Sequence, residues 1–299
     1  MNRFNLEQLR TFLAVVRLGG VRKAATGLHL TQPAVTTRIK ALEDSLSADL
    51  FDRSAGGMKL TKHGELLVSY AEKFEHLSEM VARDVIHPDG IEGRLRLGVS
   101  ETIAQCWLPE LIARCHARYP NLDIEFDVDI STNLRAALLG RELDLAILLG
   151  PISEYTIDNV DLPGFELNWY VAADAPEPDD PAEHLTRPVL TYARNTRPYR
   201  ELKDRLFELV GPDVRIFPSS SLSACFRLVE TGLGVAALPK ALGQNYLDAG
   251  TIRRFDPGWT PGPLQFSASY RGVPASHMIA SAARLAREVA IDYHRDKIM

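Results

Sequence analysis

The sequence predicts an α/β protein in which a mainly α-helical head, one long helix and a larger two-lobed domain follow one another. Three observations predict this order. Apolar residues recur at helical spacing up to about residue 86, strand-like runs alternate with helical stretches from residue 93, and "HPDG" at residues 87–90 separates the two patterns. At 299 residues the chain is long enough for two or three units with cores of their own.

Charge is distributed unevenly along the chain. Residues 1–60 contain nine Lys and Arg against five Asp and Glu, whereas the remaining residues contain 25 against 34. A basic head on an acidic body fits a DNA-binding segment attached to a domain that does not bind DNA. Apolar content of 45% with 24% charged residues is ordinary for a globular protein.

The chain shows no sign of a membrane segment, a metal site or a disulfide framework. No apolar run reaches membrane-spanning length, and the amino terminus starts with a charged amphipathic helix rather than a signal peptide. The three cysteines, like the histidines, lack metal-ligand spacing; the cysteines are Cys106, Cys115 and Cys225. We therefore expect a cytoplasmic protein with free thiols, and no pattern supports a redox pair among them.

Two helices are expected before the most informative stretch of the head. The first carries apolar residues at Leu6, Leu9, Phe12, Leu13 and Val16. The second is short, covers residues 21–27, and ends at a glycine that can terminate it. Only residues 28–31 separate it from the next predicted helix, so the pair has the spacing of a helix-turn-helix.

Residues 31–46 predict the helix that would lie in the major groove of DNA. Thr31 can cap it, and Pro33 lies in the first turn, where a missing N–H costs nothing. One face is apolar, at Val35, Ile39, Leu42 and Leu46. The opposite face and its flanks carry short polar or basic side chains that suit base contacts: Gln32, Pro33, Thr36, Thr37, Arg38 and Lys40. An ordinary surface helix is the alternative.

A turn-rich ribbon at residues 50–60 and a long helix follow. Arg53 and Lys59 could contact phosphates or the minor groove from the ribbon, or they could be solvated loop charges. The helix is expected from Thr61 to about residue 86, with a seam of Leu67, Tyr70, Phe74, Leu77 and Val81. Such a seam can pack on its own chain or on a second copy, and symmetric binding to two half-sites favours the copy.

The pattern after residue 93 predicts two α/β lobes. Strands are expected at residues 95–99, 122–130 and 143–150, with one helical stretch ending near Tyr119 between the first two and a helix at 132–139 before the third. A second unit uses "PVLTYA", "VRIF" and "LGVAALP" with intervening helices, and "LQFSASY" then returns to the first unit. "GLGVAA" matches a loose dinucleotide fingerprint, but a helix precedes it and a strand follows, so we expect no cofactor.

These segments together resemble the LysR-type transcriptional regulators. The resemblance is carried by "LHLTQPAVTTRIKALE", "LFDR", "LTKHG" and, near the end, "LVETGLGVAALPK", in the family's order. It implies a winged helix-turn-helix at 1–60, a dimerising linker helix and hinge at 61–88, and a periplasmic-binding-protein-like effector domain at 91–299. Lobe I would cover about 91–163 and 268–299, and lobe II about 164–267. It also implies a homodimer or homotetramer that contacts double-stranded DNA and RNA polymerase.

The resemblance carries DNA-contacting roles onto six positions: Gln32, Pro33, Thr36, Thr37, Arg38 and Arg53. Two positions depart from the family. Thr37 stands where many members have arginine, which leaves the operator preference open, and Gly20 precedes the second helix where a serine cap is common.

A small effector is expected at the carboxyl ends of the strands, between the lobes. Hydroxyls that follow predicted strands are the candidates for binding it: Ser100, Thr102, Ser131, Thr196 and Ser221. Ser131 and Thr196 could instead be helix caps. Arg194 and Arg197 could pair with an acidic effector, or they could be surface residues.

Three other functions fit the sequence less well than a transcriptional regulator does. An enzyme would need a nucleophile elbow, a P-loop or paired acid and base groups, and the sequence shows none. A transport binding protein would not carry a DNA-reading head, and a constitutive DNA binder would not need a ligand cleft. The sequence therefore predicts an effector-responsive, sequence-specific transcriptional regulator, acting as an activator or a repressor.

Overall fold

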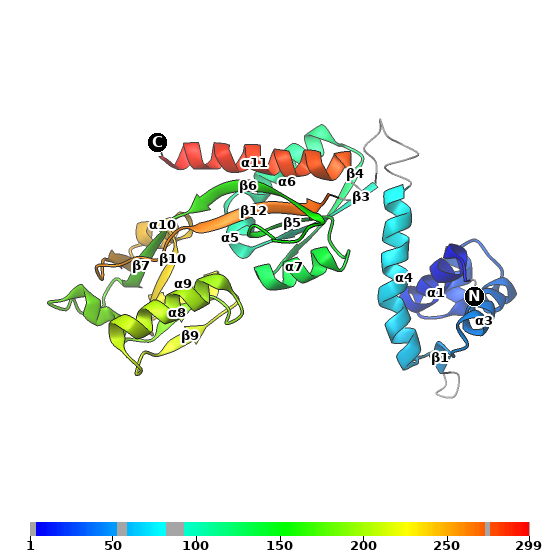
Figure 1. Ribbon diagram of the computed structural model, residues 1–299, viewed down its shortest axis with the longest axis horizontal. Helices are drawn as coiled ribbons and strands as arrows, with labels where there is room; N and C mark the ends of the chain where they lie inside the picture. The colour runs from blue at the N-terminus through cyan, green and yellow to red at the C-terminus, as the bar shows by residue number, and fades with distance from the viewer. Residues whose placement is uncertain (1–3, 53–58, 82–92, 273–275, 299) are drawn as a thin grey trace. The chain divides into compact units, whose positions relative to one another are not determined.

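The computed structural model describes residues 4–52, 59–81, 93–272 and 276–298 (Figure 1). The chain divides into two compact units, residues 1–90 and 91–299, and each is described by itself. None of the helices in the described ranges has the length and apolar character that crossing a bilayer requires.

In its described residues, the first unit consists of three short helices and a longer one, with a two-stranded wing between the third and the fourth. The elements are α1 (Leu6–Leu18), α2 (Val21–Gly27), α3 (Gln32–Leu46), β1 (Phe51–Asp52), β2 (Lys59–Leu60) and α4 (Lys62–Val81). Asn5 and Gln8 form a reciprocal capping box at the start of α1, whereas Gly20 gives α2 no side-chain cap. The helix-turn-helix predicted from sequence is therefore present.

One small core holds this unit together. Its fully buried apolar side chains come from α1, α2, α3, the wing and α4, and they include Leu9, Phe12, Val35, Ile39, Leu42, Phe51 and Ala71. Leu6, expected in the apolar stripe of α1, is exposed, and Val15 rather than Val16 is fully buried. The reason is that α1 packs between α3 and α4, so its buried surface is wider and shifted relative to a single stripe.

The wing pairs Phe51 with Leu60 and Asp52 with Lys59 in antiparallel register. The expected ribbon tip and Arg53 lie outside the described residues. Thr61 caps α4, because its hydroxyl accepts from the Gly64 N–H at 3.1 Å. The predicted end of this helix near residue 86 also lies outside the described residues.

Two five-stranded sheets form the second unit. The first has the order β4-β3-β5-β12-β6. Its strands are β3 (Gly93–Val99), β4 (Leu122–Val128), β5 (Leu145–Leu149), β6 (Ile157–Phe165) and β12 (Leu264–Arg271). The first three run parallel, as expected, whereas β12 is antiparallel to both β5 and β6. The sheet is mixed because β12 returns from the second sheet and enters in the opposite direction.

The second sheet repeats this arrangement with the order β11-β7-β10-β8-β9. Its strands are β7 (Leu167–Ala172), β8 (Val189–Thr191), β9 (Ile216–Pro218), β10 (Val235–Pro239) and β11 (Ile252–Phe255). β8, β9 and β10 run parallel, and β7 is antiparallel to β10 and β11. The two sheets with their helices are called lobe I and lobe II below.

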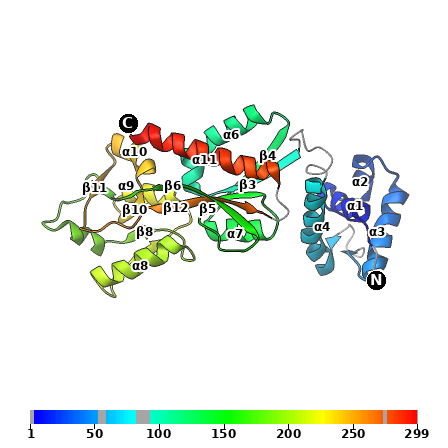
Figure 2. The same ribbon diagram turned by 45° about the horizontal axis from the view of Figure 1, so that its top comes forward.

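Helices cover both faces of each sheet (Figures 1 and 2). Those of the second unit are α5 (Glu101–Cys106), α6 (Leu108–Arg118), α7 (Ser131–Leu139), η2 (Pro181–Thr186), α8 (Arg197–Val210), α9 (Leu222–Glu230), α10 (Lys240–Asp248) and α11 (His277–Ile298). In lobe I, α11 and α6 lie on one face and α7 on the other. In lobe II, α8 packs on one face and α9 with α10 on the other.

Three details differ from the sequence prediction. The helical stretch after β3 is two helices, because Pro109 lacks an N–H and begins α6 instead of continuing α5. The boundaries between the lobes differ slightly from the predicted ones. Lobe I extends two residues past the predicted residue 163, because β6 ends at Phe165, and it resumes four residues before the predicted residue 268, because β12 starts at Leu264. β4 is an edge strand, so its Phe126 and Val128 stay half exposed despite their apolar alternation.

Candidate functional site

Helix α3 has one buried face and one exposed polar face. Thr31 caps it, with its hydroxyl accepting from the Ala34 N–H at 3.4 Å. Val35, Ile39 and Leu42 are almost fully buried against the rest of the head. Because these apolar positions fix the rotation of the helix, the opposite face points outward. That face exposes Gln32, Pro33, Thr36, Thr37 and Lys40.

The exposed polar groups of α3 are available to an external partner. The side chains of Gln32 and Thr37 make no hydrogen bond to any described residue. Thr36 donates its hydroxyl to the Gln32 carbonyl at 3.0 Å, so its methyl group and oxygen lone pairs face outward. Amide, hydroxyl and methyl groups are the contacts that read base edges in the major groove.

Arg38 lies differently from the other predicted DNA contacts. Its guanidinium is half-buried and bonds to Glu7 at 3.3 Å and to the Thr11 hydroxyl at 3.4 Å, so it is held against α1. Lys59 is exposed on β2 of the wing. Arg53 lies outside the described residues. The structure thus brings four of the six predicted residues onto one open face, with Arg38 at its flank.

Glu43 is a functional support that the sequence analysis did not identify. It is 7% exposed, and its carboxylate accepts from the backbone N–H groups of Leu50 at 2.9 Å and Phe51 at 3.4 Å. This carboxylate ties the start of the wing to α3. A Glu one position after the buried Leu42 was the available signal, because a carboxylate on the apolar face of a helix needs partners.

The linker helix α4 exposes most of its predicted seam. Ala71 is buried in the head and Leu67 is partly buried, whereas Tyr70, Phe74, Leu77 and Val81 are between 37% and 53% exposed. The ring of Phe74 contacts only Phe4 among the described aromatic residues, at 6.0 Å between centroids. An apolar stripe of this length that the described residues of its own unit leave uncovered is typical of a helix that pairs with another copy.

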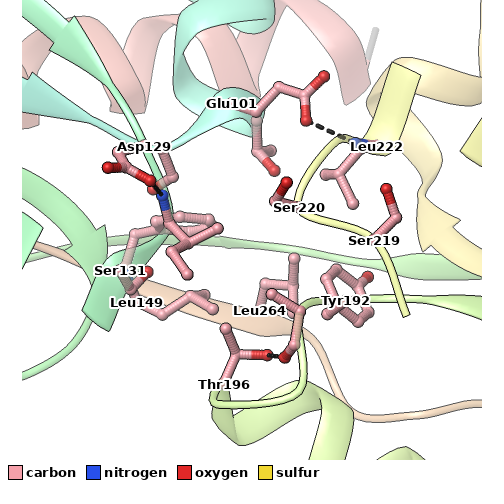
Figure 3. A pocket seen from close by; sticks show the side chains of 15 residues that line it. Glu101, Asp129, Ser131, Leu149, Tyr192, Thr196, Ser219, Ser220, Leu222 and Leu264 are labelled. Atoms are coloured by element: carbon pink, nitrogen blue, oxygen red, sulfur yellow. Dashed lines mark hydrogen bonds between the residues drawn. The ribbon is translucent and has the colours of Figure 1, made fainter. Parts of the chain in front are cut away.

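A cleft lies between the two lobes at the ends of β3, β4, β5 and β8 (Figure 3). Its cavity volume is about 60 Å³, the space of a few water molecules, so the lobes are close together. The polar lining includes six Ser or Thr hydroxyls and two carboxylates, from Ser100, Thr102, Ser131, Thr196, Ser219, Ser220, Glu101 and Asp129. The apolar lining comes mainly from Ile130, Leu149, Tyr192, Leu222, Leu264 and Phe266.

Four of the five hydroxyls predicted from sequence meet in this cleft. Ser100 donates to the Ile147 carbonyl at 3.0 Å, Ser131 accepts from the Leu149 N–H at 3.0 Å, and Thr196 donates to the Ala193 carbonyl at 2.7 Å. These three hydroxyls therefore also hold strand ends and turns. The Thr102 hydroxyl makes no hydrogen bond to a described residue.

Ser221 is the exception. Its hydroxyl caps α9 by accepting from the Ala224 N–H at 3.2 Å, and it does not line the cleft. Ser219 and Ser220 line it instead. Ser220 is exposed and makes no side-chain hydrogen bond to a described residue, so its hydroxyl is free for a ligand. Of the two capping alternatives, Thr196 occupies the cap position of α8 without a side-chain cap bond, and Ser131 lies inside α7.

The predicted arginine partners lie outside the cleft. Arg197 lines an adjacent pocket of about 300 Å³ with Arg135 and Arg200, and Arg194 lines neither space. Arg197 pairs with Glu201 at 3.7 Å, and Arg135 pairs with Glu154. Within the described ranges, no three of His, Cys, Asp and Glu lie together as metal ligands would.

The thiols of Cys115 and Cys225 and the hydroxyl of the cleft tyrosine are neutral at physiological pH. Burial raises the pKa of Cys225 to about 11, and burial does the same for Cys115. Thiols with raised pKa values are poor nucleophiles. Burial, with a smaller contribution from Cys225, also raises the pKa of Tyr192, whose hydroxyl donates to the Ala237 carbonyl at 3.1 Å.

A helix-turn-helix with an exposed polar helix, joined to two α/β lobes with a cleft between them, defines a one-component regulator that combines a DNA-reading unit with a ligand-binding unit. Residues 6–65 match the family model "Bacterial regulatory helix-turn-helix protein, lysR family", and residues 88–290 match "LysR substrate binding domain". The chain therefore belongs to the LysR family of transcriptional regulators, which are not enzymes.

Individual relatives agree with this assignment. The chain is 30% identical to the HTH-type transcriptional regulator GltR of Bacillus subtilis over 249 residues, 83% of this chain and 84% of GltR. Among solved structures, full-length OxyR from Pseudomonas aeruginosa has a TM-score of 0.65 at 23% identity, covering 97% of this chain and 95% of OxyR. CbnR in complex with its target DNA has a TM-score of 0.65 at 19% identity, covering 96% and 100%. Both structures share the fold.

Proposed function

We propose that this regulator reads its operator through the outer face of α3. The observation that carries the proposal is the pair of exposed side chains, Gln32 and Thr37, that no described residue bonds. A glutamine amide can pair with adenine through two hydrogen bonds, and threonine can contact the thymine methyl group. The structural neighbour CbnR, which is in complex with its target DNA, supports DNA as the partner.

The remaining head residues have supporting roles. Pro33 and Thr36 complete the groove-facing surface, and Lys59 contributes a phosphate contact from the wing. Arg38 adds a contact at the flank, from the position in which Glu7 holds it. The role of Arg53 stays a prediction from the family resemblance.

The protein acts as a homodimer or homotetramer whose α4 helices pair. The exposed seam of α4 supports this, because Tyr70, Phe74, Leu77 and Val81 recur at spacings of three and four. Two heads related by symmetry would contact two half-sites. Because its DNA target is in the cytoplasm, the regulator acts there.

A small effector binds in the interlobe cleft and shifts the closure of the lobes. The free hydroxyls of Thr102 and Ser220, one from each lobe, support a ligand that bridges them. A ligand that prefers one closure changes the population of that state. In the oligomer this would change the spacing of the heads, the bend of the DNA and contact with RNA polymerase.

Fluorescence anisotropy on the full chain tests the DNA proposal. The probe is the duplex upstream of the protein's own gene, and a scrambled duplex is the control. We expect tighter, salt-dependent binding to the upstream duplex. Thr36→Ala should lose selectivity, whereas Ser69→Ala, which removes an exposed hydroxyl that also donates to its own helix, should keep it. Equal binding of wild type to both duplexes over all salt concentrations would contradict the proposal for this operator.

Thermal stabilisation by a panel of metabolites tests the cleft. A ligand that stabilises wild type should stabilise Ser220→Ala less, because the variant lacks one cleft hydroxyl. The same ligand should alter the DNase footprint and transcription at saturating occupancy. An unchanged footprint and unchanged transcription with the cleft filled would rule out the closure mechanism.

A further inference from the structure

The carboxylate of Glu101 connects lobe I to lobe II across the cleft. Glu101 begins α5 in lobe I, and its carboxylate accepts hydrogen bonds from the start of α9 in lobe II. Figure 3 shows the one from Leu222. One oxygen accepts from the Leu222 N–H. The other accepts from the Ser223 N–H at 3.0 Å, the Ser223 hydroxyl at 2.7 Å and the Ser221 hydroxyl at 3.3 Å. Gln105 of α5 donates to Glu101 at 3.0 Å and to the Ser223 hydroxyl at 2.8 Å.

This contact places an anion where the start of a helix favours one. The first N–H groups of an α-helix have no partner inside the helix, and the helix dipole adds partial positive charge there. The Glu101 carboxylate accepts hydrogen bonds from the N–H groups of Leu222 and Ser223, and the Ser221 hydroxyl accepts one from the Ala224 N–H. The first turn of α9 is therefore fully bonded before any ligand arrives.

The other acidic residue of the cleft lies just before α7 in lobe I, but none of the described first-turn N–H groups of that helix donates to it. Asp129 accepts from the Ile130 N–H at 2.7 Å and from the Asn133 amide at 3.0 Å, at the start of α7. Both carboxylates of the cleft thus lie near a helix start, and only Glu101 bonds first-turn N–H groups. No Lys, Arg or His occurs among the described residues that line this cleft. Arg135, Arg197 and Arg200 line the adjacent pocket, which shares Ser131, Leu149 and Thr196 with the cleft, so cations lie beside the cleft but not among the residues that line it.

We propose that Glu101 is a resident anion that fills the anion-binding position at α9 and holds the lobes together when no effector is bound. Because that position is filled, the cleft selects an uncharged or amine-bearing effector and rejects one that must place a carboxylate at α9. This selectivity rests on the proposed function of the cleft as the effector site, and it specifies the chemical class of the effector. An acidic effector, which Arg194 and Arg197 suggested from sequence, is disfavoured only where its carboxylate would lie at α9; Arg197 lines the adjacent pocket, and Arg194 lines neither space.

Chemical rescue on the full chain tests the proposal, with acetate as the probe. Glu101→Ala removes the part of the side chain that acetate resembles and leaves the α9 donors unbonded. Hydrogen–deuterium exchange in a peptide covering residues 219–226 reports on these donors directly. We expect about tenfold faster exchange of the Leu222 and Ser223 amides in Glu101→Ala than in wild type. Acetate should slow exchange in the variant and raise its Tm, and neither should change in wild type.

Two further variants make the result decisive. Glu101→Gln keeps the side-chain volume, so its amides should exchange faster than those of wild type and acetate should have no effect. Glu154→Ala removes an exposed carboxylate that pairs with Arg135 away from α9, and its 219–226 peptide should exchange as in wild type. Equal exchange in wild type and both Glu101 variants would overturn the resident-anion role, and so would folded Glu101→Ala that acetate leaves unchanged.

The acetate result in wild type tests the selectivity separately. Acetate protection of the wild-type 219–226 peptide would show that an external carboxylate displaces Glu101, and would overturn the exclusion of a ligand carboxylate from α9. None of these measurements requires the effector or DNA. Their failure is therefore distinguishable from failure of the proposed function, which operator binding and the ligand panel test.

Discussion

The outer face of α3 and the interlobe cleft are both polar, but the fold treats their polar groups in opposite ways. On α3, Gln32 and Thr37 point outward with no bond to a described residue. In the cleft, the hydroxyls of Ser100, Ser131 and Thr196 already bond to the backbone. Polar side chains without internal partners are free to recognise an external one, so the head can be assigned to recognition residue by residue.

In the cleft, structural and binding roles are superimposed on the same residues. Substituting a bonded hydroxyl there will change stability as well as ligand binding, which makes its effect harder to interpret. Thr102 and Ser220 are the cleft hydroxyls that resemble the α3 groups in being free. The predictions below test this difference, starting with the largest expected effect.

The buried face of α3 should carry the stability of the head. Ile39→Ala is expected to destabilise the head by about 2–5 kcal/mol, because it removes buried methyl groups and leaves a cavity. The adjacent exposed Lys40→Ala should stay within about 0.5 kcal/mol. Hydrogen exchange of head peptides in increasing urea measures both. Similar midpoints for the two variants would contradict the assignment of the two faces.

The buried thiol of Cys225 should make the effector unit less stable at alkaline pH. Burial raises its pKa from an ordinary value near 9 to about 11, so the folded state holds the proton more tightly than the unfolded state. The resulting stability is present below pH 9 and is lost as the pH rises to 11, by at most roughly 2–3 kcal/mol.

Urea unfolding at pH 8 and pH 10.5 measures this loss. Cys225→Ala should show a smaller decrease between the two pH values than wild type, whatever its stability at pH 8. Equal decreases would mean that Cys225 does not contribute to the alkaline sensitivity.

The carboxylate that ties the wing to α3 should matter to the head more than its exposed neighbours do. Glu43→Ala leaves the N–H groups of Leu50 and Phe51 without this partner, at an expected cost of about 1–3 kcal/mol. Asp44→Ala, at an exposed position next to it, is the control. Unfolding midpoints of head peptides give the comparison, and an unchanged midpoint for Glu43→Ala would show that the wing is held by other contacts.

The smallest effects should separate bonded from free cleft hydroxyls. Ser100→Ala is expected to cost about 1 kcal/mol, because it removes a buried hydrogen bond to Ile147. Ser220→Ala should cost less than about 0.5 kcal/mol while weakening ligand binding. Urea unfolding of the effector unit measures the free energy of unfolding of both variants. An equal decrease in Ser100→Ala and Ser220→Ala would contradict the distinction between bonded and free hydroxyls.

The contrast between the head and the interlobe cleft also explains which features could be predicted from sequence. The head was predictable because local patterns determine it: Thr31 caps α3, and Val35, Ile39 and Leu42 fix which face is buried. In the lobes, apolar runs of residues predicted the strands β3, β4 and β5 and the return of β12 to lobe I, but not the order of the strands in the sheet.

Features that depend on tertiary contacts could not be predicted. The position of Glu43 beside buried Leu42 signals that its carboxylate needs partners, but the sequence does not say which groups bond Glu43 or Glu101. Ser219, Ser220 and Ser221 are adjacent in sequence, and only the start of α9 decides that Ser221 caps the helix while the other two line the cleft. Phe126 and Val128 alternate like core residues but lie on an edge strand.

The central claim is that α3 reads DNA sequence and the cleft does not. The ratio of the scrambled-duplex Kd to the operator Kd, measured by anisotropy at one salt concentration, tests this claim for wild type, Gln32→Ala and Ser220→Ala. We expect Gln32→Ala to lower the ratio by about 10- to 100-fold, from a lost base contact of about 1–3 kcal/mol, and Ser220→Ala to leave it unchanged. An unchanged ratio in Gln32→Ala, or a lowered one in Ser220→Ala without effector, would contradict the account.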